Sequence, residues 1–392
     1  VGSRDEHPDV AGSSHFLEHL LFKGTKRRSA RDIAEAFDAV GGDLNAYSAK
    51  EYTTFYARVL DRDLPMAVEH LCDMLQGSVI RKADVDAERQ VILEEIHMHE
   101  DAPDELIHDL FAQTMWDGHP LGRPVLGTRE TIRAVSAAQV RGFWRSHYVP
   151  ANFVVTAAGN LGHDRLARML EDHMDTGPRV RRGTHSLRQG GEIPAVSSRH
   201  EVRRRPTEQA HICIGTGGMA RNDPRRFAFG VVNNAIGGGM SSRLFQEVRE
   251  KRGLAYSVYS YHSMFAETGI FCVYAGTSPS RAGQVVDLMM KELDDVAERG
   301  IGGEELDRAK GHMKGSMVLS LEDTSGRMSR LGKSEVGHGE ILSIDETLDR
   351  VNAVTAEDAR AAAGAVLSGP RALAVIGPFA KREFAGIVGG RR

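Results

Sequence analysis

The chain has 392 residues, of which 41% are hydrophobic and 27% charged, a balance typical of a globular protein rather than a disordered or fibrous one. The formal net charge of −4 lacks the basic excess of a nucleic-acid-binding protein. No apolar run reaches the ~18 residues that a membrane helix needs. A chain of 392 residues is too long for one ordinary core, so we expect two domains and neither nucleic acid nor membrane as a partner.

Helical spacing and capping residues predict several helices in the first half, and β-branched and aromatic residues predict strands. The predicted helices are 29–40, 63–77, 82–99, 103–116, 136–148 and 163–174, and the predicted strands lie in 44–60 and 152–160. Residues 177–206 are rich in Gly, Pro, Ser and Arg, and apolar periodicity stops there. This change of composition indicates a linker.

The second half repeats the plan of the first. Strands are predicted at 209–218, 254–263, 269–277 and 371–378, and helices at 223–238, at 241–253 and from about 281 and 303. "SSHFLEHLLFKGT" and "SSRLFQEVREKRG" both begin Ser-Ser at a helix start. We therefore predict an α+β protein of two homologous α/β-roll repeats, each a mostly antiparallel sheet with helices on one face. The predicted domains are 1–180 and 207–392, joined by a linker at 181–206.

Cys72, Cys213 and Cys272 are odd in number, widely spaced and set in apolar contexts. This pattern predicts buried free thiols in a reducing compartment rather than disulfides. His108 is expected to be structural or exposed.

The stretch "SSHFLEHLLFKGT" at 13–25 places His15, Glu18 and His19 on one predicted helix. Side chains four residues apart share a helix face, so His15 and His19 can bind one metal ion. Glu18 points near that face and can accept a proton from metal-activated water. A catalytic zinc usually has three protein ligands, and the acidic helix "DAERQVILEEIHMHED" offers candidates for the third. Glu88, Glu94, Glu95, His97 and His99 all remain possible from composition alone.

The blocks "HFLEHLLFKGT", "GGDLNAYSAKEYTTFYA" and "ERQVILEEI" resemble those of the inverted-motif zinc peptidases of the pitrilysin (M16) family. The match is closest to the roughly 45 kDa branch that includes mitochondrial processing peptidase β-subunits and their bacterial relatives, and it covers essentially the whole chain. The resemblance implies zinc ligands at His15, His19 and Glu95. It also implies a catalytic base at Glu18 and a supporting carboxylate at Glu88.

Two further blocks imply substrate contacts. "VREKRGLAY" resembles the family segment whose Arg and Tyr hold the scissile carbonyl, here Arg249 and Tyr256. In "GGDLNAYS" the resemblance implies that substrate adds as a strand at Asn45 and Ala46, a mode that tolerates many peptide sequences. The family's N-terminal edge strand, which precedes "GSRDE", is expected to be missing from this chain. Arg243 and Gln246 stand where the first repeat has His15 and Glu18, so the second repeat is not expected to bind zinc in this way.

The resemblance thus implies a zinc-dependent endopeptidase acting on unfolded peptides or presequence-like segments. It also implies a homodimer or a heterodimer with a related subunit, because family chains of this size pair. The alternative is a catalytically weak or silent subunit or maturation factor for one dedicated partner. The expected location is the bacterial cytoplasm, with the mitochondrial matrix as the alternative.

Overall fold

The computed structural model describes residues 1–174, 191–196 and 198–387, which form two compact units. Unit 1 consists of residues 1–99, 123–187 and 323–336, and unit 2 of residues 100–122, 188–322 and 337–392. Both units are therefore discontinuous in sequence, unlike the contiguous domains predicted at 1–180 and 207–392. Within the predicted linker, residues 181–190 and 197 lie outside the described residues.

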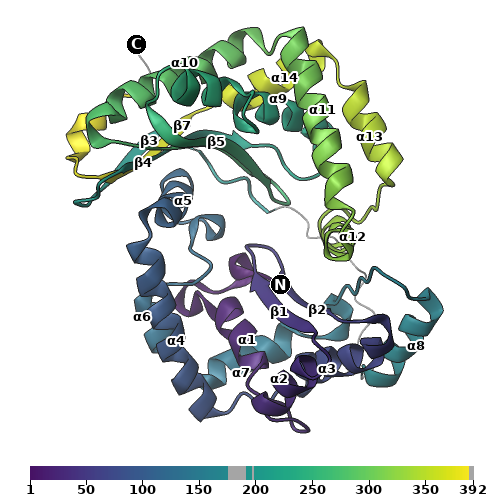
Figure 1. Cartoon of the computed structure of the whole chain (residues 1–392). Coiled ribbons are helices and arrows are strands. Elements are labelled where there is room, and N and C mark those ends of the chain that lie inside the picture. Colours follow the sequence, from purple (N-terminus) through teal and green to yellow (C-terminus); the bar gives the residue numbers. More distant parts are fainter. Residues whose placement is uncertain (175–190, 197, 388–392) are drawn as a thin grey trace. The chain divides into compact units, whose positions relative to one another are not determined.

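Unit 1 is mainly helical. Its helices are α1 (Ser13–Leu21), α2 (Ala30–Asp38), α3 (Leu64–Gly77), α4 (Lys82–Asp101), α6 (Arg129–Ala134), α7 (Ala137–His147) and α8 (His163–His173), together with most of α12 (Thr324–His338). Its sheet, in the part of the chain described, is the antiparallel pair β1 (Asp43–Ser48) and β2 (Thr53–Arg58). Phe16, Leu17 and Leu20 of α1 share a core with Ile92 and Ile96 of α4. This packing holds α1, which carries His15 and His19, against α4, which carries Glu95. Both helices are labelled in Figure 1.

The strand predicted at 152–160 does not form. Pro150–Asn152 is a 3-10 turn, and residues 153–158 are extended chain that pairs with no strand among the described residues. Side chains from Phe153 to Ala157 instead line an apolar cavity of about 280 Å³ with β2, α3, α8 and α12. The apolar pattern thus marks a segment that is only partly buried, with Val155 48% exposed, and that lines a cavity instead of joining a β-ladder.

Unit 2 is built on a five-stranded sheet. Its strands are β3 (Arg199–Arg204), β4 (Ala210–Gly218), β5 (Ala255–Met264), β6 (Gly269–Thr277) and β7 (Arg371–Gly377), in the order β3-β7-β4-β6-β5. All neighbours are antiparallel except β3 and β7. The mixed helices and sheet confirm the predicted α+β class.

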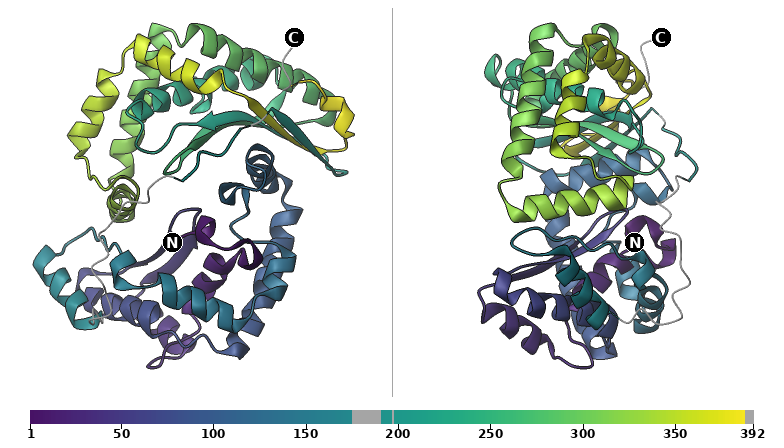
Figure 2. Two further views of the ribbon diagram at one scale, coloured as in Figure 1. Left: turned by 180° about the vertical axis from the view of Figure 1, so that it is seen from behind. Right: turned by 90° about the vertical axis from the view of Figure 1, so that its right-hand side faces the viewer.

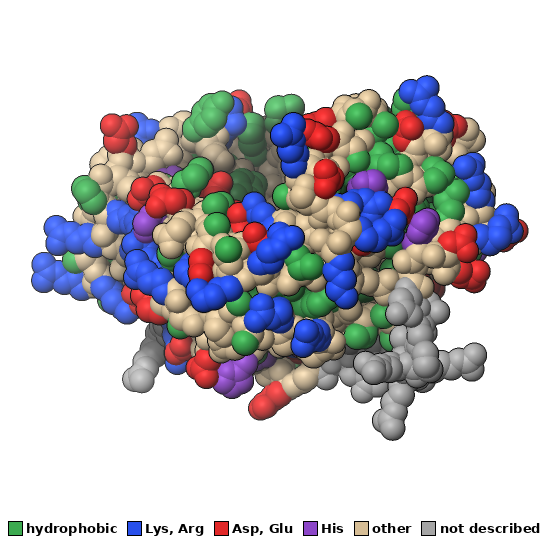
Figure 3. Space-filling model, turned by 90° about the horizontal axis from the view of Figure 1, so that it is seen from below, with side chains coloured by type: hydrophobic (Ala, Val, Ile, Leu, Met, Phe, Trp, Pro, Cys, Tyr) green, Lys and Arg blue, Asp and Glu red, His purple; other side chains and the backbone are tan. Residues whose placement is uncertain are grey.

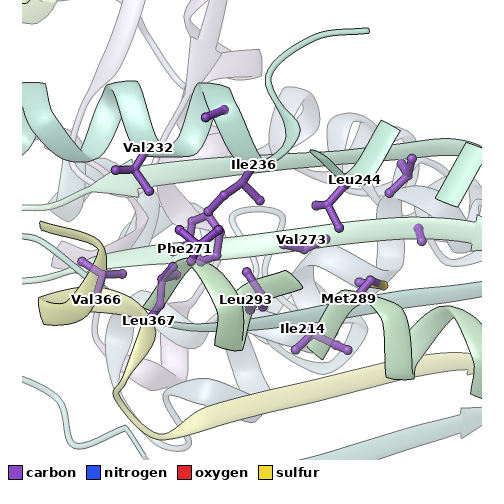
Figure 4. Close-up of a cluster of buried hydrophobic side chains, with 14 of the residues drawn as sticks. Ile214, Val232, Ile236, Leu244, Phe271, Val273, Met289, Leu293, Val366 and Leu367 are labelled. Carbon is purple, nitrogen blue, oxygen red and sulfur yellow. The ribbon is translucent and has the colours of Figure 1, made fainter. Parts of the chain in front are cut away.

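Helices cover one face of this sheet, as Figures 1 and 2 show. The helices of unit 2 after β3 are α9 (Arg226–Gly237), α10 (Ala282–Arg299), α11 (Gly303–Ser320), α13 (Ile344–Ala353) and α14 (Ala356–Leu367). Figure 4 shows the resulting core, in which Ile236 of α9, Leu293 of α10 and Leu367 of α14 surround Phe271 and Val273 of β6. Alternate residues of the strands, such as Phe271, Val273 and Ala275 of β6, point into this core.

The opposite face of the sheet is covered by α5 (Pro103–Met115), which the sequence analysis had placed in the first domain. Leu106, Ile107 and Phe111 of α5 pack with Ala374 and Ile376 of β7. The apolar stripe of α5 therefore belongs to the core of unit 2, which explains why residues 100–122 group with that unit.

Two further segments differ from prediction. Residues 199–204, assigned to the linker, form the edge strand β3, whose charged sequence RHEVRR is typical of a protected sheet edge. Residues 241–253, predicted as a helix, contain a six-residue π-helical turn at Phe245–Glu250. Such turns are often found at functional sites.

Among the residues that the structure describes, no helix combines the length and apolar character needed to cross a membrane. On the face shown in Figure 3, basic and acidic side chains are intermixed, with small hydrophobic areas between them.

Candidate metal centre

Helix α1 starts at a strained position that only glycine adopts readily. Gly12 precedes the helix with φ of +93°, and a Cβ there would lie 2.7 Å from Leu126 O. The buried Glu6 carboxylate accepts hydrogen bonds from the backbone N–H groups of Gly12 and Ser14, both at 2.6 Å. Burial raises the pKa of Glu6 to about 7, against the lowering effect of these hydrogen bonds. Glu6 thus anchors the start of the helix that carries the histidines.

His15, His19 and Glu95 converge within unit 1. Glu95 Oε2 lies 3.6 Å from Nε2 of His15 and 3.6 Å from Nε2 of His19. One ligand atom from each residue falls within 4.8 Å of the others. Glu95 Oε2 is buried and has no hydrogen-bond partner among the residues described. A buried carboxylate oxygen left without a donor, between two imidazole nitrogens, fits a cation ligand.

The structure also separates Glu95 from its neighbour. The Glu94 side chain is 77% exposed and lies 3.7 Å from His97 on the outer surface of α4. Glu94 and His97 therefore pair with each other, whereas Glu95 lies beside the two histidines.

His15 is suited to metal binding by its charge state. Burial, and secondarily the nearby His19, lowers the pKa of His15 to about 3. A neutral imidazole is the form that binds a metal. Two imidazoles and one carboxylate are a known donor set for catalytic zinc, so these residues fit the ion that the sequence predicts.

Glu18 lies on the same helix and is held by a strand. Ser48 of β1 donates a 2.6 Å hydrogen bond to Glu18 Oε2. Burial raises the pKa of Glu18, and the negative charge of Glu95 adds to this effect. A carboxylate with a raised pKa is better matched to proton transfer near neutral pH.

Glu88 supports His19 from a position about two turns before Glu95 on α4. Glu88 Oε2 lies 3.2 Å from His19 Nδ1, and its other oxygen lies 2.5 Å from Lys23 Nζ. A carboxylate on Nδ1 leaves Nε2 of His19 free to bind a metal, the usual arrangement of ligand histidines. The predicted supporting role of Glu88 thus has a specific atomic basis.

Arg249 and Tyr256 meet within unit 2. Arg249 Nη1 donates to the Tyr256 carbonyl at 3.0 Å, and the guanidinium lies 4.6 Å from the centre of the Tyr256 ring. Tyr256 sits at a register shift of β5 between Ala255 and Ser257, and it is 79% exposed. Bulges of this kind re-aim side chains and are frequent beside active sites.

Asn45 and Ala46 lie on β1, which pairs only with β2 among the described strands. The Ala46 N–H donates to Asn45 Oδ1 at 2.8 Å. This donor thus has a local side-chain acceptor.

Arg243, at the position in the second repeat that corresponds to His15, is held by acidic groups. Its guanidinium makes bonds of 2.6 and 2.8 Å to Glu305 and of 2.6 Å to Asp295, and it lies 3.8 Å from Glu292. A fixed cation therefore lies among carboxylates at this position.

Three contributors were missed by the sequence analysis: Glu6, Ser48 and Lys23. Lys23 follows His19 by one helical turn, a spacing that could have suggested a shared partner. Glu6 and Ser48 act from a loop and a strand, and no local spacing connects them with α1.

Comparisons with known proteins identify the family. Residues 1–129 match the family model described as insulinase (peptidase family M16), and residues 134–313 match the model described as peptidase M16 inactive domain. An uncharacterized zinc protease of Streptomyces coelicolor is 52% identical over 98% of this chain and 84% of its own length. An uncharacterized zinc protease of Bacillus subtilis is 41% identical over 96% of this chain and 91% of its own length.

Solved structures share the fold. A protease from Helicobacter pylori superposes with a TM-score of 0.85 at 20% identity, covering 96% of this chain and 92% of its own. A peptidase M16 inactive domain from Pseudomonas fluorescens superposes with a TM-score of 0.83 at 21% identity, covering 97% of this chain and 91% of its own.

Proposed function

The chain belongs to peptidase family M16, and on that premise we propose that it is a zinc-dependent endopeptidase acting on unfolded peptides or presequence-like segments. The observation that supports this most directly is the position of Glu95 Oε2. It is buried, it lacks a hydrogen-bond donor among the residues described, and it lies 3.6 Å from a ring nitrogen of each histidine. Evolutionary relatives named as uncharacterized zinc proteases agree with the choice of metal.

Each residue of unit 1 then has a defined task. His15, His19 and Glu95 would hold zinc, which when bound supplies Lewis-acid activation of water. Glu18 accepts the proton of the attacking water and returns it to the leaving amine, while Ser48 keeps the carboxylate oriented. Glu88 fixes the ring of His19 through Nδ1.

Substrate contacts are proposed on both units. A peptide can add as a strand to β1, where it would replace the Asn45 side chain as partner of the Ala46 N–H. Arg249 and Tyr256, from the same chain or a second chain, are proposed to stabilise the charge that develops on the scissile carbonyl oxygen. We also propose that the protein forms a dimer, of identical or related subunits. Sedimentation that shows only monomer at micromolar concentration would count against the dimer.

The decisive experiment is turnover of a quenched, unstructured peptide of about 10 to 20 residues, a length suited to strand addition. We expect Glu18→Gln to keep its zinc and lose turnover by about 100-fold or more, since it removes general acid–base catalysis. Arg249→Ala should also keep zinc and lower kcat. Glu94→Gln, on the outer face of α4, is the matched control and should behave as wild type.

A second candidate function remains the dedicated subunit or maturation factor. It predicts zinc in the wild type with no turnover of generic peptides in any variant. Absence of zinc from the wild-type protein would refute the peptidase proposal itself.

A further inference from the structure

A second group of metal-binding side chains lies in unit 2. His108 of α5, Cys213 of β4 and Cys272 of β6 place one ligand atom each within 4.8 Å of the others. Cys213 Sγ lies 3.6 Å from His108 Nδ1. The three residues are far apart in the sequence, and each taken alone is a buried thiol or a structural histidine.

The sheet register brings the thiols together. Cys213 pairs with Tyr274, and Cys272 pairs with Gly215. Residues two apart on a strand share a face, so Cys213 and Cys272 are diagonal neighbours on one side of the sheet. That side is the one covered by α5, whose apolar residues pack with both cysteines. His108 faces them from α5.

The separations suit tetrahedral zinc. Zinc–sulfur bonds of about 2.3 Å and zinc–nitrogen bonds of about 2.0–2.1 Å place a sulfur and a nitrogen ligand about 3.6 Å apart and two sulfur ligands about 3.8 Å apart. The observed distance of 3.6 Å from Cys213 Sγ to His108 Nδ1 agrees with the first value. The two sulfur atoms lie within 4.8 Å of each other, which is compatible with the sulfur–sulfur separation expected for zinc.

The surroundings favour the ligating form of His108. Its Nε2 lies 3.1 Å from the Tyr259 hydroxyl, and its Nδ1 lies 2.9 Å from the Tyr261 hydroxyl. With the proton on Nε2 donated to Tyr259, Nδ1 keeps its lone pair. That lone pair faces the Tyr261 hydroxyl at 2.9 Å and becomes available to a metal when the hydroxyl turns away. Tyr261 then stands beside the site as a fourth ligand or as a partner for a bound water.

The charge of the two thiolates and the exposure of a neighbouring side chain favour a divalent cation. Cys213 and Cys272 are fully buried free thiols in the chain as described, and His108 is half-buried. Two thiolates and a neutral imidazole make a soft donor set. A divalent cation neutralises the two thiolates, whereas a monovalent one would leave a net buried charge, which is costly. Tyr259, which is 36% exposed, marks the side from which an ion can enter.

We propose that His108, Cys213 and Cys272 form a second zinc site that ties α5 to β4 and β6. The site is separate from the centre on α1 and α4 and does not depend on peptidase activity. The covalent change is simple: zinc binding releases the two thiol protons to solvent and forms two zinc–sulfur bonds and one zinc–nitrogen bond.

The test uses the full chain, stripped by a chelator under reducing conditions and reloaded with zinc or with cobalt. We expect two zinc ions per wild-type chain and one in His15→Ala/His19→Ala. Cobalt-loaded wild type should show a thiolate-to-cobalt charge-transfer band in the near ultraviolet. The band should persist in His15→Ala/His19→Ala, because only the second site contains sulfur.

Cys213→Ser and Cys272→Ser should each abolish the band and lower the zinc content by one. Cys72→Ser, which removes a buried thiol of unit 1, is the matched control. It should keep both the charge-transfer band and the zinc content of wild type. Absence of the band from cobalt-loaded wild type overturns the proposal without any variant that must fold. One zinc per chain without the band would leave the centre on α1 intact and refute only the second site.

Discussion

At the scale of single residues, the proposed metal centre includes groups that would not touch the metal. Glu88 is buried and bonds both His19 Nδ1 and Lys23 Nζ. We expect Glu88→Gln to weaken zinc binding by about 10- to 100-fold, because partners of ligand histidines typically contribute that much. Competition with a chromogenic chelator measures the affinity. Glu94→Gln is the control, since that exposed side chain faces away from the ligands.

Residue-scale predictions from the sequence succeeded where the geometry is local. The spacing of His15 and His19 alone places both rings on one face of α1, whatever the rest of the chain does. The choice between Glu94 and Glu95 needed either the family resemblance or the packing of α4, because neighbours on a helix differ by about 100° in direction. The approach of His108 to Cys213 depends on docking of a helix on a sheet, and no local spacing encodes it.

At the scale of secondary-structure elements, the start of α1 is sensitive to pH. Burial raises the pKa of Glu6 to about 7, whereas the unfolded chain has about 4.5. The folded state therefore holds more protons between these values, so the stabilising contribution is complete below pH 4.5 and is lost as pH rises through 7. The loss is on the order of 3 kcal/mol.

Denaturant unfolding of wild type and Glu6→Gln from pH 5 to pH 8 tests this effect. The stability advantage of wild type over the variant should shrink as pH rises, since Gln does not titrate. A difference that stays constant with pH would show that Glu6 keeps an ordinary pKa in the folded state.

The Arg243 cluster is a second feature at the element scale. It ties the segment before the π-helical turn to α10 and α11 through Asp295 and Glu305, and these side chains are only 18–28% exposed. Removing the cation leaves carboxylates uncompensated, which costs about 3–5 kcal/mol in fully buried pairs.

We expect Arg243→Met to lower the free energy of unfolding by about 2–4 kcal/mol, somewhat less than for full burial. Arg308→Met is the control, because its 3.4 Å pair with Glu304 is on the surface, and it should change stability by less than about 0.5 kcal/mol. Equal effects of the two substitutions in urea unfolding would contradict a structural role for the cluster.

Element prediction failed for identifiable physical reasons. β3 was hidden by the charged residues that protect a sheet edge, and residues 153–158 looked like a strand because they are apolar, although they only line a cavity. The boundary of the first domain was missed because the apolar stripe of α5 does not reveal which core receives it. By contrast, β1, β2, β4, β5, β6 and β7 were predicted, since alternation, aromatic content and apolar runs report burial directly.

At the scale of the whole molecule, the two units have separate cores. The core of unit 1 centres on Phe16 and Ile92, and the largest core of unit 2 centres on Phe271 and Leu293. The two clusters share no residue, so perturbations of one core should be felt first in its own unit.

We therefore expect calorimetry to separate two substitutions. Leu293→Ala removes a fully buried side chain of unit 2, and such changes cost about 2–5 kcal/mol. This substitution should lower the transition temperature of unit 2, while zinc continues to stabilise unit 1. His15→Ala/His19→Ala should remove the zinc-dependent part of the unit 1 transition and leave that of unit 2 in place. A single transition shifted by both substitutions would show that the units unfold together, and the stability of the proposed metal centre would then depend on the core of the other unit.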